Sequence, residues 1–232
     1  MTKASAGDII GRDTLSQKVY AVLRERILTG QLKQGQRIGE LAVSKELGVS
    51  ATPVREALRL LKGDSLIEYE GRRGARVICP SIAEIVQCYD VRLVLETLAL
   101  KEADANFTDA DRDHFVALAE KTCVAAPPQV MFMRDRDFHA FFIEKAANTW
   151  VSTFYRAIVD FLLVVRLPSS RKQRFADAGA EHLVIANAIR DRDLETALAT
   201  LEMQIKRSRD WSIEARTGSA GTEQVSLGKM VK

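Results

Sequence analysis

At 232 residues the chain exceeds a typical single domain, so two modest domains are the better expectation. It is 47% hydrophobic and 28% charged, with no long uncharged apolar run and no N-terminal signal pattern, so we expect a globular, cytoplasmic protein. The cysteines Cys79, Cys88 and Cys123 are odd in number and lack C-x-x-C spacing, which argues against a disulfide framework or a thiolate metal cluster.

Positive charge is concentrated in the N-terminal third. Residues 14–78 hold twelve Lys or Arg and seven Asp or Glu, a net charge of +5, whereas residues 79–232 hold twenty and twenty-two, a net charge of −2. This asymmetry indicates a polyanion-binding N-terminal part on a near-neutral body, although solubility alone would also account for it.

Apolar periodicity predicts three helices in this basic part, at residues 15–29, 40–47 and 51–62. The segment "SLIEYEGRRGARVIC" then alternates apolar and polar residues on both sides of a glycine-flanked pair, Arg72 and Arg73. This pattern is typical of a β-hairpin with a basic tip. Together the elements predict one compact unit.

The stretch "GVSATPVREALRLL" predicts a helix with one apolar face, formed by Val54, Ala57, Leu58 and Leu61. The outer face then carries Thr52, Arg55 and Arg59. Ser50 or Thr52 is suited to cap the helix N-terminus, where Pro53 is tolerated. Backbone donors and positive charge are therefore concentrated at the end that recognition helices insert into the major groove of DNA.

Pro80 marks the best domain boundary, because it cannot continue a strand and because Ser81 and Glu84 form a capping box for a new helix. From there the pattern is helical to about Trp211, with turn signals near 105–109, 125–129, 167–171 and 191–193. We predict a first domain over residues 12–79, an all-helical domain over 80–212 and a disordered tail over 213–232.

Polar residues at helical spacing form a second candidate site. Asp135 and His139 lie four residues apart, so they share one helix face and form half of a common metal-binding arrangement. If the helices around His182 and Gln204 form an antiparallel hairpin, these residues lie roughly 12 Å and 16 Å from its turn and reach a common point. Arg92 lies beside the apolar face of its helix, where a buried charge needs a partner, and Glu96 is the nearest candidate.

The N-terminal part resembles the winged-helix bacterial repressors of the GntR family. The likeness rests on "LAVSKELGVSATPVREALRLL" together with apolar and glycine positions before and after it: Leu15, Tyr20, Leu23, Ile27, Gly30, Leu32, Gly35, Leu66, Ile67, Gly74 and Val77. The resemblance implies a winged helix-turn-helix in which Arg55 reads bases and Ser50, Thr52, Arg59, Arg72 and Arg73 contact phosphates or grooves. Many members have Arg where this chain has Ala51, which puts the operator sequence in doubt.

The remainder is similar to the all-α ligand-binding domain called FCD, found in the FadR-type branch of the same family. The likeness implies that Asp135, His139 and His182 bind Zn or a similar divalent ion, with Gln204 replacing the usual last histidine and weakening the site. It also implies that Arg92 holds an effector carboxylate and that Asn148 lines the pocket. The alternative is a polar network without metal, able to bind a small molecule directly and formed by Asp135, His139, His182 and Gln204.

The resulting expectation is a mainly α, homodimeric transcriptional regulator that binds a palindromic operator in double-stranded DNA. A small carboxylic acid in the helical domain would control the operator affinity, with repression relieved by the ligand as the expected sign. A regulator that senses the metal ion itself is the main alternative. A metal-dependent hydrolase is disfavoured, because no additional general base or nucleophile accompanies the site.

Overall fold

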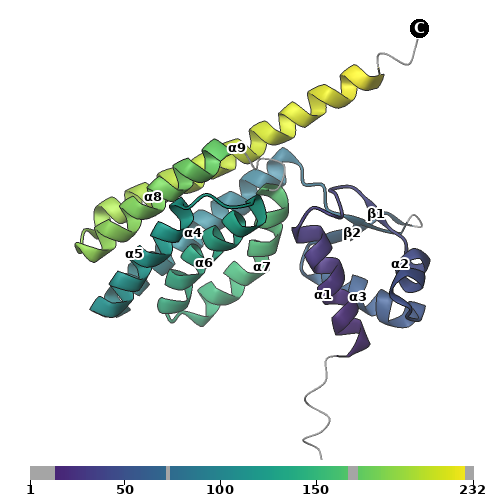
Figure 1. The fold of residues 1–232 in the computed structure, drawn as a ribbon, viewed down its shortest axis with the longest axis horizontal. Coiled ribbons are helices and arrows are strands. Elements are labelled where there is room, and N and C mark those ends of the chain that lie inside the picture. Colours follow the sequence, from purple (N-terminus) through teal and green to yellow (C-terminus); the bar gives the residue numbers. More distant parts are fainter. Residues whose placement is uncertain (1–13, 72–73, 167–171, 228–232) are drawn as a thin grey trace, which may run out of the picture. The chain divides into compact units, whose positions relative to one another are not determined.

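The computed structural model describes residues 14–71, 74–166 and 172–227 (Figure 1). The chain divides between Cys79 and Pro80 into two compact units. The first combines helices with a small sheet, whereas the second is helical in its described ranges. Among the described helices, none has the length and apolarity needed to cross a membrane.

Within the described residues, the N-terminal unit contains the three predicted helices and a three-stranded sheet. The helices are α1 (Leu15–Leu28), α2 (Glu40–Leu47) and α3 (Ala51–Gly63), and the strands are β1 (Arg37–Ile38), β2 (Ile67–Tyr69) and β3 (Ala75–Val77). Strands β2 and β3 are antiparallel and form the predicted hairpin. Strand β1 pairs with β3, which gives the order β1-β3-β2. This strand was not predicted from the sequence. A two-residue strand is too short to show alternation.

The buried face of α3 determines which of its residues remain outside. Val54, Leu58 and Leu61 are fully buried, as the apolar spacing predicted, and α3 packs against α1. Before it, Gly48 ends α2 with a φ of 65°, a left-handed conformation that suits glycine and turns the chain toward α3. Helices α2 and α3 therefore form a helix-turn-helix with the charged side of α3 exposed.

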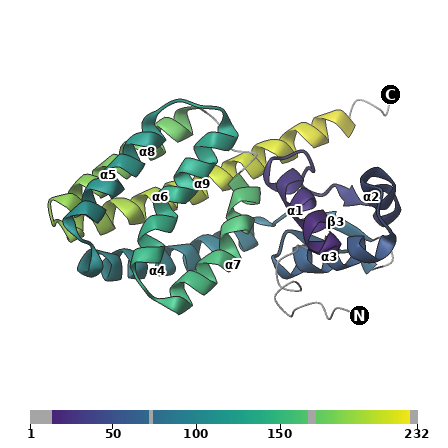
Figure 2. The same cartoon turned by 60° about the horizontal axis from the view of Figure 1, so that its bottom comes forward.

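The described part of the second unit is built from long helices (Figures 1 and 2). They are α4 (Ile82–Asn106), α5 (Asp109–Cys123), α6 (Pro128–Lys145), α7 (Thr149–Arg166), α8 (Lys172–Arg190) and α9 (Leu194–Leu227). Ser81 and Glu84 form the predicted capping box at the start of α4. Helices α8 and α9 lie side by side and form the expected helical hairpin.

One break between helices was not predicted. Helix α6 ends at Lys145, and α7 begins at Thr149 after Ala147, which has a positive φ of 55°. The side chain of Asn148 accepts hydrogen bonds from the backbone N–H groups of Trp150 and Val151, both at 3.2 Å. The turn therefore depends on one asparagine cap, and the local sequence has no glycine or proline to mark it.

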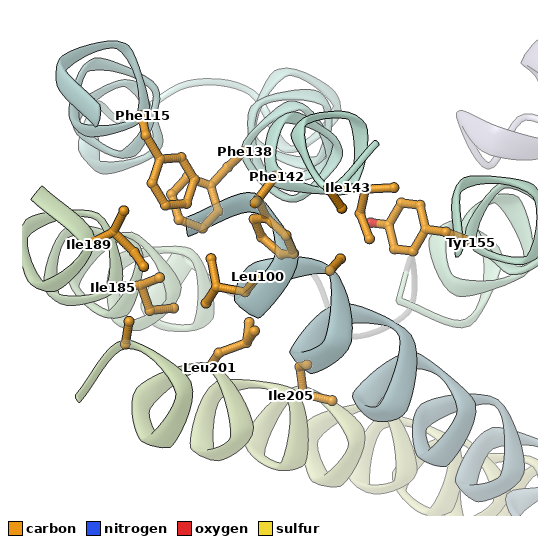
Figure 3. Packing of buried hydrophobic residues seen from close by; sticks show 14 of the residues in the cluster. Leu100, Phe115, Phe138, Phe142, Ile143, Tyr155, Ile185, Ile189, Leu201 and Ile205 are labelled. Carbon is orange, nitrogen blue, oxygen red and sulfur yellow. The ribbon is translucent and has the colours of Figure 1, made fainter. Parts of the chain in front are cut away.

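Aromatic and aliphatic side chains fill the centre of the helical unit (Figure 3). Phe115 from α5 stacks on Phe138 from α6 with ring centroids 4.5 Å apart. Leu100 from α4 and Leu201 from α9 are fully buried in the same cluster. Because this core draws on every helix of the unit, it holds α6 and α8 in the positions that bring their polar residues together.

Part of the tail predicted over residues 213–232 is helical in the structure, where α9 continues as far as Leu227. Ile213 packs against the core, and the adjacent Ser212 is buried and hydrogen-bonded to Tyr89. An isolated glycine such as Gly218 costs a helix only about 1 kcal/mol relative to alanine, so it does not stop a helix whose first turns are packed. Residues 228–232 lie outside the described ranges.

Candidate functional site

The exposed side of α3 carries the residues predicted to contact DNA. Thr52, Arg55 and Arg59 are exposed, as the helical spacing predicted. Ser50 occupies the N-cap position, but its side chain makes no capping hydrogen bond. The first turn of α3 therefore presents backbone N–H groups without a side-chain cap, which is an arrangement suited to phosphate.

Arg55 is held by a carboxylate from the preceding helix. Its Nε donates to Oε2 of Glu40, the first residue of α2, at 2.7 Å, while 64% of the Arg55 side chain remains exposed. Because this bond uses Nε, the N–H groups of the two terminal nitrogens can donate to other acceptors. Two such donors match the O6 and N7 acceptors of guanine.

The structure does not place the predicted wing tip, since Arg72 and Arg73 lie outside the described residues. Arg76, which the hairpin pattern places beside them, is engaged within the sheet. It donates to Glu68 at 3.0 Å and forms an ion pair with Glu70 at 2.8 Å. Arg76 therefore stabilises the hairpin.

The helical unit brings together the three predicted metal ligands. Asp135 and His139 on α6 and His182 on α8 are all buried, and each offers a ligand atom within 4.8 Å of the other two. The Nε2 atoms of the two histidines are 3.3 Å apart, and His182 Nε2 lies 3.9 Å from Oδ1 of Asp135. One carboxylate and two imidazoles so arranged are a common donor set for a divalent ion.

Hydrogen bonds on the far side of each ring assign the histidine tautomers. His139 Nδ1 lies 2.8 Å from the carboxylate oxygen Oε2 of Glu96, an ion-pair distance that favours the ring proton on Nδ1. The hydroxyl of Thr122 donates to the carbonyl of Ala119 at 2.6 Å. Its oxygen therefore accepts a hydrogen bond from the Nδ1–H group of His182 at 3.0 Å. Both Nε2 atoms then carry lone pairs that face each other, as they do when histidines bind a metal.

Burial keeps His182 neutral. Desolvation, followed by the neighbouring His139, lowers the pKa of His182 to about 3. Burial also opposes ionisation of Asp135, but the guanidinium of Arg166 outweighs it and holds the pKa of that carboxyl well below its usual range. At neutral pH the cluster therefore presents an uncharged imidazole at His182 and an ionised carboxylate at Asp135.

Arg92 is placed as a member of this cluster. Its Nε donates to Oε1 of Glu96 at 2.6 Å, which confirms the predicted pair, and its Nη2 lies 3.1 Å from Nε2 of His139. Burial alone would raise the pKa of Glu96, but Arg92 and then His139 lower it to about 2. The permanently charged guanidinium of Arg92 thus lies beside the histidines. A guanidinium is a group that binds anions.

Gln204 is buried on α9, with only 5% of its surface exposed. Its Oε1 atom has no hydrogen-bond partner among the described residues. One turn later, Ser208 accepts a hydrogen bond from Arg174. A buried carbonyl oxygen without a partner is costly, and a ligand or ion would relieve that cost.

Two other residues singled out by the sequence lie away from these contacts. Asn148, expected to line an effector pocket, caps α7 and donates to both carboxylate oxygens of Glu102, at 3.2 and 3.1 Å. These bonds include no member of the cluster, and its effector role stays a prediction. His114 is exposed, with its ring centroid 5.1 Å from that of Phe141.

Two further buried residues contact the cluster and were not predicted from the sequence. Arg166, the last residue of α7, donates through both terminal nitrogens to Asp135, and Thr122 orients His182. Arg166 follows the apolar run "FLLVV", where a charged residue at the end of a buried helix is a detectable signal. No pattern in the sequence marks Thr122, because its partner is 60 residues away.

Comparisons with known proteins agree with both halves of this description. Residues 15–77 match the family described as "Bacterial regulatory proteins, gntR family", and residues 87–207 match the "FCD domain" family. A gluconate operon transcriptional repressor from Bacillus licheniformis is 24% identical over 201 residues, covering 83% of this chain and 82% of that protein. The repressor NanR from Klebsiella aerogenes is 27% identical over 223 residues, covering 85% of each.

Solved structures share the fold. A GntR transcriptional regulator from Rhodococcus sp. RHA1 superposes with a TM-score of 0.75 at 22% identity, covering 86% of this chain and 98% of that one. Escherichia coli McbR/YncC superposes with a TM-score of 0.71 at 19% identity, covering 88% and 99%. The predicted fold class, a winged helix-turn-helix followed by an all-α domain, is thereby confirmed.

Proposed function

We propose that this chain, a transcriptional regulator that belongs to the GntR family and carries an FCD domain, changes its affinity for DNA when a small anionic molecule binds in the helical unit. Its similar relatives are transcriptional regulators, so the chain is a regulator and not an enzyme. Repression that is relieved by the ligand is the sign we propose.

Contact with DNA is assigned to the N-terminus of α3. Arg55, supported by Glu40, reads guanine, while Thr52 and Arg59 contact phosphates or the groove edge. Ser50 lies at the start of α3, where the backbone N–H groups face a phosphate. Arg72 and Arg73 stay predicted wing contacts.

A divalent ion is proposed to bind Asp135, His139 and His182. The single observation that carries this proposal is the pair of imidazole lone pairs, 3.3 Å apart, with both ring protons engaged elsewhere. When bound, an ion such as Zn²⁺ would supply a Lewis-acidic centre for an anionic group of the ligand. Gln204 has a buried carbonyl oxygen available, but a neutral amide is a weaker ligand for Zn²⁺ than imidazole.

The proposed ligand is a small carboxylic acid, because Arg92 places a buried guanidinium beside His139. Glu96 holds Arg92 in position through Nε, and Nη2 faces the cluster. A guanidinium binds a carboxylate with both charge and geometry, and Nη2 is the donor that could serve a ligand carboxylate. The carbon skeleton of the ligand is not identified by this contact.

A homodimer is proposed because the helical unit exposes apolar side chains at helical spacing. On α4, Val91, Val94 and Leu98 are 47%, 65% and 41% exposed and follow one another at spacings of three and four. On α7, Trp150 and Phe154 are also exposed, with their rings stacked at 6.0 Å. Such surfaces mark contact with another chain, and two copies would present two α3 helices to a palindrome.

Metal analysis and DNA binding together test the proposal. Purified full-length protein should carry a divalent ion that chelator removes, and it should shift DNA from upstream of its own gene in preference to random competitor. A small carboxylic acid should then change that affinity, and only in the metal-loaded protein. If metal alone changes the affinity and no carboxylic acid does, the chain senses metal. A chelated protein that responds fully to its ligand would contradict the ion site.

A further inference from the structure

The ion pair between Arg166 and Asp135 has an unusual position for a predicted metal ligand. Arg166 Nη1 lies 2.5 Å from Oδ2 of Asp135, and Nη2 lies 2.7 Å from Oδ1. Both residues are 5% exposed. The guanidinium therefore engages both oxygens of the one carboxylate in the cluster, through a bidentate contact in a region of low dielectric.

An ion at this cluster would share Asp135 with Arg166. Oδ1 is the oxygen that lies 3.9 Å from Nε2 of His182, and it is also the acceptor of Arg166 Nη2. Full engagement of the ion by Asp135 therefore weakens or breaks at least one guanidinium bond. The ion and the guanidinium would both be positive and would share one carboxylate, so they would repel each other.

The sum of the buried charges also disfavours binding of the ion without an anion. Arg92 and Arg166 contribute two positive charges, and Glu96 and Asp135 contribute two negative ones, so these four residues are neutral together. A divalent ion raises that sum to +2 in a region from which water is excluded. Buried charge that is not compensated is strongly unfavourable. An anionic ligand restores the balance.

We propose that Arg166 competes with the metal ion for Asp135, so that the ion is held tightly only together with an anionic ligand that compensates the guanidinium. The proposal rests on the ion site described under Proposed function, and it adds a regulatory role for Arg166. The ion and the anionic ligand then bind cooperatively. Each compensates the charge of the other, so each binds more tightly when the other is present.

The surroundings of Arg166 connect this competition to the end of α7. The backbone carbonyl of Arg166 accepts a hydrogen bond from Nη1 of Arg174 on α8, at 3.2 Å. Burial, followed by the nearby Arg166, lowers the pKa of Arg174 to about 9. The residue that engages Asp135 is thus also hydrogen-bonded through its backbone to a buried arginine of α8.

Zn²⁺ titrations of the full-length protein test the proposal, with a chromophoric chelator as competitor and succinate as the probe anion. In the parent protein, succinate should tighten Zn²⁺ binding severalfold. Arg166→Gln should bind Zn²⁺ without succinate roughly tenfold or more tighter than the parent, and succinate should add little. Arg112→Gln is the matched control, because Arg112 is another buried arginine whose ion pair is with Asp104; it should behave as the parent does.

Two outcomes would overturn the role of Arg166: equal or weaker Zn²⁺ binding by folded Arg166→Gln, or parent affinity for Zn²⁺ that succinate leaves unchanged. The second measurement needs no variant, so the inference remains testable if Arg166→Gln does not fold. Failure of the ion site itself has a different signature. In that case the parent, with or without succinate, would bind no more Zn²⁺ than His182→Gln.

Discussion

Acidification of the metal-free protein should destabilise the helical unit through His182. The pKa of this residue is about 3 in the folded chain because of burial and then His139, compared with about 6.5 in an unfolded chain. Between these two values the unfolded chain binds a proton that the folded chain refuses. The stabilisation is therefore complete above pH 6.5 and is lost as the pH falls toward 3. At pH 5, which lies about 1.5 units below the pKa of the unfolded chain, the loss of unfolding free energy is about 2 kcal/mol.

Urea unfolding in the presence of chelator, at pH 7 and pH 5, measures this loss. Both tryptophans of the chain, Trp150 and Trp211, belong to the helical unit, so their fluorescence reports its unfolding and not that of the N-terminal unit. The parent should lose about 2 kcal/mol of unfolding free energy between the two pH values. His182→Gln should lose much less, since a glutamine at this position does not titrate.

Comparison of the pH difference within each protein separates titration from the general cost of the substitution. His182→Gln is expected to be less stable than the parent at pH 7, because it leaves a cavity and loses a hydrogen bond to Thr122. Only the dependence on pH is diagnostic. Equal losses in the two proteins would refute the argument that a neutral, buried His182 faces the cluster.

Two further predictions concern the DNA contact and the assembly. Arg55→Ala should weaken specific binding by about 1–3 kcal/mol in a gel shift, while Arg136→Ala, which changes a partly exposed arginine of the helical unit, should bind as the parent does. Unchanged binding by Arg55→Ala would remove Arg55 as a base reader. The double substitution Val94→Glu with Leu98→Glu should halve the mass found by sedimentation, because it places charge in the proposed interface. Met203→Glu is the control on α9, and a variant pair that stays dimeric excludes this face of α4.

Local patterns were enough to predict most elements and the outer face of α3. Residues spaced by three and four report directly which side of a helix is buried, so Val54 and Leu58 identify the position of Arg55. The spacing of Asp135 and His139 likewise placed two candidate ligands on one face. The contribution of His182 required a resemblance as well, because it lies on a different helix.

The residues that were missed act over long sequence separations or without a local signal. Arg166 reaches Asp135 across 31 residues, and no periodicity connects them. The break at Ala147 depends on a backbone conformation that alanine seldom adopts. The extension of α9 past Ile213 follows from packing on the core, which overrides a composition that resembles a tail. Tertiary contacts therefore decide these positions.

The central claim is that the buried cluster of the helical unit controls how the N-terminal unit binds DNA. The direct test is the affinity of the full chain for its operator, measured by fluorescence anisotropy with Zn²⁺ and a series of small carboxylic acids, for the parent and for His182→Gln. We predict that at least one acid lowers the operator affinity of the parent by about tenfold, and that His182→Gln binds the operator equally well but does not respond. An equal response in both proteins, or no preference of the parent for any DNA under all of these conditions, would contradict the account.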